Sequence, residues 1–206
     1  MKEVNIFCFG FGQVAKNFIK KINTKNIKIN LTVTSRETTN KGVFDGIEYY
    51  SFQFSQDSFD KNLIKNLESS NYILVSIAPI SGEDIVIKNF QNIFEEKKIK
   101  WLTYLSATSV YGDHKGEWVD EKSKTIPTSL TGTQRLKAEQ SWIELAKNQD
   151  LPIQIFRLSG IYSHESNILK RLKSGDAKII KKENQFFSRI HVEDIAEILF
   201  KSLEKF

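Results

Sequence analysis

The sequence has one cysteine, three histidines and no long apolar run, and each scarcity argues against a class of protein. A single cysteine, Cys8, cannot form an internal disulfide, and its apolar surroundings predict a small core residue, as in a protein of the reducing cytoplasm. His114, His164 and His191 are too dispersed to form a metal cluster with it, so no metal site is expected. No apolar run approaches the roughly 20 residues that span a bilayer.

Positive charge is in slight excess but is not gathered into one block. The 206 residues include 30 Lys and Arg against 25 Asp and Glu, a net charge of +5 spread along the chain. This pattern does not favour nucleic-acid binding. With 40% hydrophobic residues and a mean hydropathy of −0.36, the composition is typical of a soluble globular protein. The length predicts a single domain over residues 1–206.

Near its start, the sequence leads from an apolar strand through two glycines into an amphipathic helix. Gly10 suits a tight turn that a side chain would obstruct, and Gly12 permits close approach of a backbone. Ala15 takes the third small position of a Gly-x-Gly-x-x-Ala spacing, so that the helix packs on the strand and its first residues, Gln13 and Val14, face an anion. A dinucleotide pyrophosphate fits this description, the alternative being a tight turn without a ligand.

The end of the second expected strand, 27–34, carries a further clue. A dinucleotide site often has an acid here that bonds the adenosine ribose of NAD, whereas this chain continues with Ser35 and Arg36. A hydroxyl and a cation suit a 2′-phosphate, which favours NADP over NAD. A solvated arginine is the alternative, and Glu37 would partly neutralise the site.

Strand and helix patterns alternate along the rest of the chain. This alternation predicts an α/β fold with a doubly wound parallel sheet and helices on both faces. After the first strand and the helix 13–22, strands are expected at 27–34, 47–52, 72–79, 101–106 and 152–158, and helices at 58–67, 82–96, 132–148, 167–174 and 191–205.

The run from Tyr72 to Pro79 is nearly continuously apolar, as is typical of a parallel strand covered on both faces. Its small residues Ser76 and Ala78 would let a flat cofactor lie across the strand tip, or they serve only in packing. The one long polar stretch, 113–130, is interpreted as a functional or capping loop.

Six landmarks along the chain resemble, in the same order, those of the extended or atypical short-chain dehydrogenase/reductases of the NAD-dependent epimerase/dehydratase type. They are the glycine loop, Ser106-Ala-Thr-Ser-Val-Tyr-Gly112, Val119-Asp-Glu121 with Pro127, Lys137-Ala-Glu139, Leu158-Ser-Gly-Ile-Tyr162 and Ser188-Arg-Ile-His-Val-Glu-Asp194. The resemblance implies a Rossmann-type sheet that binds NAD or NADP. It also implies a substrate such as a nucleotide sugar or a related small hydroxyl or carbonyl compound.

The resemblance places the family's catalytic residues, and this chain departs from the family at each of them. The Tyr-x-x-x-Lys pair falls on Thr131 and Arg135, and the Ser or Thr falls on Ala107. In the family, the Lys lowers the tyrosine pKa and binds the nicotinamide ribose, the Tyr exchanges a proton with the substrate, and the hydroxyl orients the substrate oxygen. A threonine hydroxyl is far less acidic than a phenol. Arg135 could hold a ribose or phosphate but is a poor proton carrier.

Neighbouring side chains are the next candidates for these roles. Thr108 and Ser106 flank the vacant serine position and could supply an orienting hydroxyl in a slightly different direction. Tyr104 and Tyr111 are the nearest phenols in sequence, although Tyr111 also fits a packed aromatic at the strand end. The catalytic candidates are therefore Thr108, Tyr111 and Arg135.

Two charged residues near the end of the chain are further candidates. Arg157 closes the sixth strand, where strand ends meet the ligand crevice of such sheets, so we expect it to contact cofactor phosphate or substrate, the alternative being a salt bridge. Asp194 is expected to cap or brace the closing helix rather than to act as a base.

Extended relatives continue past the closing helix with further segments of a substrate lobe, so here we expect that lobe to be small, open or completed by a partner subunit. The expected helices 82–96 and 132–148 correspond to those that form a four-helix dimer contact in the family. A homodimer and a monomer both stay open. Trp142, on the second of these helices, fits either an interface or the core.

Three functions are consistent with these residues. The first is an NADP-dependent enzyme of the epimerase, dehydratase or reductase kind. The second is a regulatory or interaction protein that keeps NADP(H) without redox chemistry, because of Thr131, Arg135 and Ala107. The third is an interaction protein with an empty Rossmann site. Neither a nucleic acid nor a membrane is expected as a partner.

Overall fold

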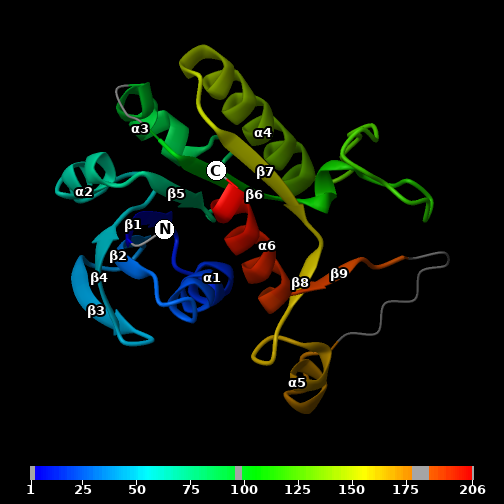
Figure 1. Ribbon diagram of the computed structural model, residues 1–206. Helices are drawn as coiled ribbons and strands as arrows, with labels where there is room; N and C mark the ends of the chain where they lie inside the picture. The colour runs from blue at the N-terminus through cyan, green and yellow to red at the C-terminus, as the bar shows by residue number, and fades with distance from the viewer. Residues whose placement is uncertain (1–2, 96–98, 178–185, 206) are drawn as a thin grey trace.

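The computed structural model describes residues 3–95, 99–177 and 186–205 (Figure 1). The strands are β1 (Glu3–Phe9), β2 (Lys28–Ser35), β3 (Asn40–Phe44), β4 (Ile47–Gln53), β5 (Tyr72–Val75), β6 (Trp101–Ala107), β7 (Ile153–Leu158), β8 (Gly160–Tyr162) and β9 (Arg189–His191). The helices are α1 (Gln13–Asn23), α2 (Leu63–Ser69), α3 (Ile85–Glu95), the short 3-10 helix η1 (Thr108–Val110), α4 (Leu130–Gln149), α5 (Ile168–Lys173) and α6 (Val192–Lys205).

The main sheet has seven strands in the order β3-β4-β2-β1-β5-β6-β7, and all neighbours pair in parallel except β3 and β4. The chain winds outward from β1 through β2 to β4, then crosses back to β5 and winds the other way through β6 and β7. The expected doubly wound α/β sheet is therefore confirmed. Its winding direction reverses between β1 and β5, which is where such sheets bind ligands.

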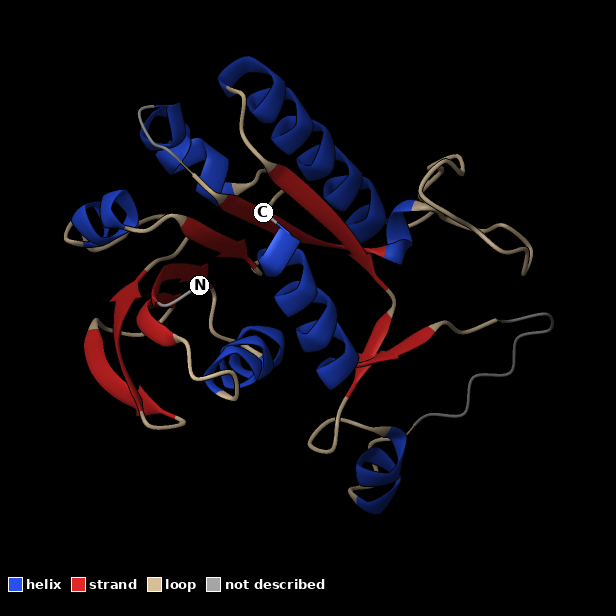
Figure 2. Cartoon of the chain, in the orientation of Figure 1, coloured by secondary structure: helices blue, strands red, loops and turns tan. Residues whose placement is uncertain are grey.

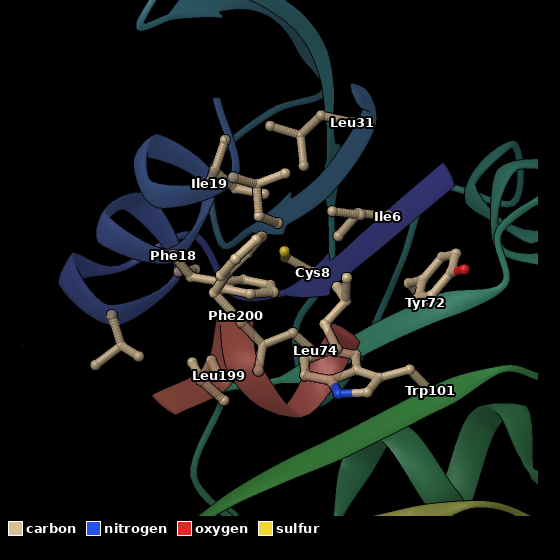
Figure 3. Packing of buried hydrophobic residues seen from close by; sticks show 14 of the residues in the cluster. Ile6, Cys8, Phe18, Ile19, Leu31, Tyr72, Leu74, Trp101, Leu199 and Phe200 are labelled. Atoms are coloured by element: carbon tan, nitrogen blue, oxygen red, sulfur yellow. The ribbon is translucent and has the colours of Figure 1, made fainter. Parts of the chain in front are cut away.

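Both faces of the sheet are covered by helices because side chains alternate along each strand. Along β1, Ile6 and Cys8 pack with α1 and α6, whereas Phe7 and Phe9 pack with α2, α3 and α4. Figure 3 shows Cys8 enclosed among residues such as Phe18 of α1. Cys8 is fully buried, and burial raises the pKa of its thiol. The prediction that it is a core residue is confirmed.

An additional edge strand, β3, was not expected from the sequence. It forms an antiparallel hairpin with β4 through Asp45 and Gly46, which both have positive φ, +52° and +77°. An Asp-Gly pair with this backbone is typical of two-residue hairpin turns. The Asp-Gly turn signal was present in the sequence, but residues 40–44, Asn-Lys-Gly-Val-Phe, do not alternate between apolar and polar side chains as a strand does.

Helix α2 begins at Leu63, five residues later than the expected start of helix 58–67. The preceding segment is held in a turn by Asp60, whose carboxylate accepts hydrogen bonds from the Asn62 N–H (2.9 Å) and the Thr39 hydroxyl (2.8 Å). Aspartate competes with helix formation in this way because its side chain bonds nearby backbone.

Helix α3 begins at Ile85 rather than at 82, and residue 96 of the expected helix lies outside the described residues. Asp84 sets this start, because one carboxylate oxygen accepts from the N–H groups of Val86 (2.9 Å) and Ile87 (3.1 Å). The other oxygen accepts from Trp142 Nε1 at 2.9 Å. Burial raises the pKa of Asp84, and these donors oppose the rise. Trp142 is fully buried and so belongs to the core.

A small lobe leaves the carboxyl edge of the sheet after β7. It contains the parallel pair β8 and β9 and the helix α5, which has no buried residue (Figure 2). The long loop after η1 extends from the same edge (Figure 2). Among the described residues, no helix is both long and apolar enough to cross a membrane.

Candidate functional site

The glycine loop leaves β1 through a turn that requires glycine. Gly10 has φ +88°, and a Cβ there would lie 2.8 Å from both Ile77 Cγ2 and Ser76 Oγ. Its N–H donates to Thr34 Oγ1 at 2.9 Å, and Ser76 Oγ donates to the Phe9 carbonyl at 2.9 Å. Because Ser76 turns back onto the loop, the strand expected to reach 79 ends at Val75.

The second glycine lies immediately before α1 and faces open space. A Cβ at Gly12 would meet no atom within 4 Å, and no side chain caps the helix there. Ala15 is fully buried against the core, so the helix begins close to the sheet. The turn and helix predicted from the glycine spacing are formed, and their open side is where an anion would meet the positive end of the helix dipole.

A cavity of about 280 Å³ lies at the carboxyl ends of β1, β5, β6 and β7. It brings together five of the predicted ligand residues: Gly12, Gln13, Val14, Ser76 and Arg135. The remaining wall is formed by Ala15 of α1, residues 105–107 at the end of β6, Leu158 at the end of β7, and residues 159 and 161. These segments are far apart in sequence and meet only because parallel strands end at one edge.

A larger groove of about 1140 Å³ runs along β2, β3 and β4 near the amino ends of β2 and β4. It contains none of the predicted ligand residues and lies away from the point where the winding reverses. We therefore place the candidate site at the smaller cavity. No group of three or more His, Cys, Asp or Glu side chains in the described ranges is arranged to hold a metal ion.

Other predicted residues lie outside the described lining of this cavity. Ser35 and Arg36 follow each other at the carboxyl end of β2, next to β1, and Arg36 is exposed. Ala78 is exposed beyond β5. Thr108 begins η1, and Tyr111 follows it in a buried position, so the structure does not bring these two catalytic candidates to the cavity.

Arg135 reaches the cavity from α4 but is tied to the sheet. Its Nη1 donates to the Leu105 carbonyl at 2.6 Å, and the side chain makes no ion pair with an acid in the described ranges. Thr131, one turn earlier, is exposed, and its hydroxyl lies 3.2 Å from that of the helix cap Ser129. The positions of the family's Lys and Tyr therefore hold a positioned cation and a surface hydroxyl.

No family model and no curated protein matches this sequence. Solved structures do match it. The UDP-N-acetylglucosamine 4-epimerase of Methanobrevibacter ruminantium M1 has a TM-score of 0.75 and 16% identity over 99% of this chain and 74% of its own. The UDP-glucuronic acid 4-epimerase of Bacillus cereus, solved with UDP-glucuronic acid and NAD, has a TM-score of 0.77 and 16% identity over 99% of this chain and 73% of its own. At this identity the likeness shows the fold.

A nearer relative is a conserved protein of unknown function from Silicibacter pomeroyi DSS. It has 31% identity and a TM-score of 0.81, over 100% of this chain and 69% of its own. The chain belongs to one family with it. It also has the fold of epimerase/dehydratase-type structures, so the resemblance stated from the six sequence landmarks is confirmed at the level of the fold.

This family member has no phenol in the described lining of its cavity. Tyr104 is fully buried, and burial raises its pKa to about 12 although the charge of Arg135 acts in the opposite direction. Tyr111 is 6% exposed, with the guanidinium of Arg157 4.9 Å from its ring centre and His114 against its edge. The surroundings of Tyr111 are those of a packed aromatic, and neither phenol belongs to the described lining of the cavity.

Arg157 is held by an acid, which is the salt-bridge alternative that the sequence offered for it. Its Nε lies 3.1 and 3.2 Å from the two carboxylate oxygens of Glu139, and its Nη2 lies 2.8 Å from Oε2. The hydrogen bonds to Glu139 raise the pKa of Arg157. The Glu139 side chain is 1% exposed, so this pair joins α4 to β7 beneath the site.

Phe11, between the two glycines, supports the glycine loop through contacts that sequence reasoning missed. Its ring lies 5.4 Å from that of Phe44 and 5.1 Å from that of Tyr49, and Lys16 Nζ lies 5.7 Å from its centre. These contacts fasten the glycine loop to the β3–β4 hairpin. Nothing local in the sequence indicates them, because the hairpin itself was not expected.

Proposed function

We propose that this family member binds a nicotinamide dinucleotide across the β1/β5 reversal and acts on a nucleotide sugar or a related small hydroxyl or carbonyl compound. The observation that carries the proposal is the cavity at the strand ends, bounded by the first turn of α1 and by Arg135. A dinucleotide fits there because Gly12 leaves open space at a helix N-terminus.

The described residues suggest how the two halves of the dinucleotide would be held. Gly10, Gly12, Gln13 and Val14 would hold the pyrophosphate, with Ser76 and Ala78 beside it. Ser35 and Arg36 end the neighbouring strand, where the adenosine ribose would lie, and their hydroxyl and cation favour NADP. NAD is the cofactor in the Bacillus cereus structure, so the preference for NADP rests on these two residues.

The bound nicotinamide would supply hydride transfer. Arg135 would hold a ribose hydroxyl or phosphate, and Ser106 would orient a substrate oxygen. Since neither Tyr104 nor Tyr111 lines the cavity, a proton would have to come from solvent or from the substrate itself.

Calorimetric titration of NADP and NAD into the purified chain tests the dinucleotide site. We expect micromolar or tighter binding with NADP preferred, and a loss of about tenfold or more for Gly12→Val, because its side chain fills the space that the pyrophosphate needs. Gly12→Ala, a smaller change, should lose less. Melting temperatures near that of the wild type confirm that both variants fold, and unchanged affinity in Gly12→Val would contradict the placement.

A second function, binding without redox chemistry, is favoured by the absence of a phenol from the described cavity wall. The two are separated by incubating the NADP-loaded chain with a panel of nucleotide sugars and small carbonyl compounds. Turnover of any of them supports the enzyme. Dinucleotide binding with no turnover across the panel supports a regulatory or interaction protein.

We also propose that the chain forms a homodimer through the outer faces of α3 and α4. These helices pack against each other, and Gln149 Nε2 donates to the Gln91 carbonyl at 3.2 Å across them. Ile143 of α4 is 39% exposed and offers an apolar contact.

A further inference from the structure

Ser106 is a residue of the cavity wall, and its buried hydroxyl has no hydrogen-bond partner among the described residues. The residue is 3% exposed, at the carboxyl end of β6. Buried hydroxyls in native proteins nearly always have a partner, because an unpaired one loses its hydrogen bonds to water without replacement. An unpaired hydroxyl on a residue of a cavity wall is explained if a ligand atom in the cavity becomes its hydrogen-bond partner.

Arg135 borders the same cavity and has donors to spare. A guanidinium carries five N–H donors, and the protein partner found for them is the Leu105 carbonyl. The described lining of the cavity contains this cation and no Asp or Glu. No acid faces Arg135 from the cavity wall, although the charge of Arg135 acts on the buried Asp84 and opposes the rise in the pKa of that carboxyl.

Two further features also make the cavity wall favourable to an anion. Gln13 contributes a carboxamide, and the first turn of α1 adds the partial positive charge of a helix N-terminus. Donors and positive charge thus converge on one space from α1, β6 and α4. An anion can accept from all of these donors and adds a counter-charge on the cavity side of the guanidinium.

We propose that Ser106 and Arg135 form a subsite for an anionic oxygen, either a carboxylate of the substrate or a phosphate of the dinucleotide. The identity of these two ligands rests on the proposed function. The guanidinium pairs with the anion through charge-assisted hydrogen bonds, and the Ser106 hydroxyl donates to an oxygen of the same group. The subsite therefore selects ligands by charge as well as by shape.

Ser106→Ala is the informative variant, because it removes a hydroxyl that bonds to nothing in the described protein. Thr103 provides a matched control: its hydroxyl is also buried and unpaired on β6, but it does not line the cavity. Thr103→Val should leave ligand affinity unchanged. Arg135→Gln removes the cation, and Arg171→Gln removes an exposed arginine of α5 as its control.

Two calorimetric titrations of the full chain distinguish the sources of the anion. The first compares D-glucuronate with D-glucose in the presence of saturating NADP, since the two sugars differ by a carboxylate. The second titrates NADP and NAD alone. We expect Ser106→Ala and Arg135→Gln to weaken one of these ligands by about tenfold, with wild-type melting temperature in the Ser106 variant. Loss confined to D-glucuronate assigns the subsite to the substrate, and loss of dinucleotide affinity assigns it to a phosphate.

The proposal is overturned if Ser106→Ala behaves like Thr103→Val, with every affinity within about twofold of the wild type. It is also overturned if the wild type binds neither D-glucuronate nor a dinucleotide. Binding of D-glucuronate that depends on Ser106, without any dinucleotide binding, would refute the proposed function and leave the subsite standing.

Discussion

Glu139 and Arg157 show how much a single pair of residues contributes beneath the site. The carboxylate is almost completely enclosed, at 1% side-chain exposure, while the guanidinium is 21% exposed and also covers the Tyr111 ring. Breaking such a pair from one side leaves a charge without its partner, which costs more than the intact pair contributes. The pair therefore holds α4 against β7 and keeps Tyr111 packed away from the cavity.

Glu139→Gln should lower the free energy of unfolding by about 3 kcal/mol, because the guanidinium of Arg157 then lacks its counter-ion. Urea unfolding followed by circular dichroism measures this. Glu83→Gln, which removes an exposed partner of Lys88, is the control and should cost less than about 1 kcal/mol. The double variant Glu139→Gln/Arg157→Gln should recover part of the loss, and a purely additive result would show that the two side chains are not coupled.

At the level of elements, the glycine loop depends on a hairpin on the far side of β2. Phe11 lies between Phe44 and Tyr49, so the loop that would hold the pyrophosphate is fastened before any ligand arrives. A preorganised loop spares the bound state the entropy of ordering it. The β3–β4 hairpin is therefore part of the proposed site although no residue of it lines the described cavity.

Phe11→Ala should weaken NADP binding by about tenfold, since a loosened loop must be ordered at a cost of about 1–2 kcal/mol. Because Phe11 is only partly buried, we expect a stability loss of about 2 kcal/mol, below that of a fully buried phenylalanine. Phe59→Ala, which removes a partly buried ring packed on Phe54 and Phe90, should lose similar stability and no affinity. Equal affinities in the two variants would refute the anchoring role.

For the whole molecule, the outer faces of α3 and α4 are the surface on which we expect a second copy. Trp142, which the sequence left open between an interface and the core, is a core residue bonded to Asp84. Ile143, its neighbour in sequence, is partly exposed and is the residue that we expect at the dimer contact.

Light scattering coupled to size-exclusion chromatography should give the mass of a dimer for the wild type and of a monomer for Ile143→Glu, because a charge at the centre of an apolar contact is costly to bury. Ile198→Glu introduces the same charge at a similarly exposed position of α6 and should leave the dimer intact. A monomeric wild type, or a dimeric Ile143→Glu, would count against this surface.

Much of the architecture followed from local patterns in the sequence. Apolar runs such as Tyr72–Val75 mark strands that are covered on both faces, and the spacing of Gly10, Gly12 and Ala15 requires a strand, a turn and a helix in that order. Where a polar side chain competed with such a pattern, as Asp60 does before α2, the expected boundary was displaced. Strand β3 was not predicted, because its strand conformation depends on pairing with β4 and not on a pattern in its own residues.

The fold class and the glycine loop could be predicted from the sequence, because both depend on residues that are neighbours along the chain. Only the tertiary structure decided which distant residues meet: Arg157 with Glu139, Arg135 with the Leu105 carbonyl, and the unpaired hydroxyl of Ser106 with the cavity. Sequence periodicity reports the face on which a side chain lies but not the partner that it finds there. The chemistry of the site depends on those partners.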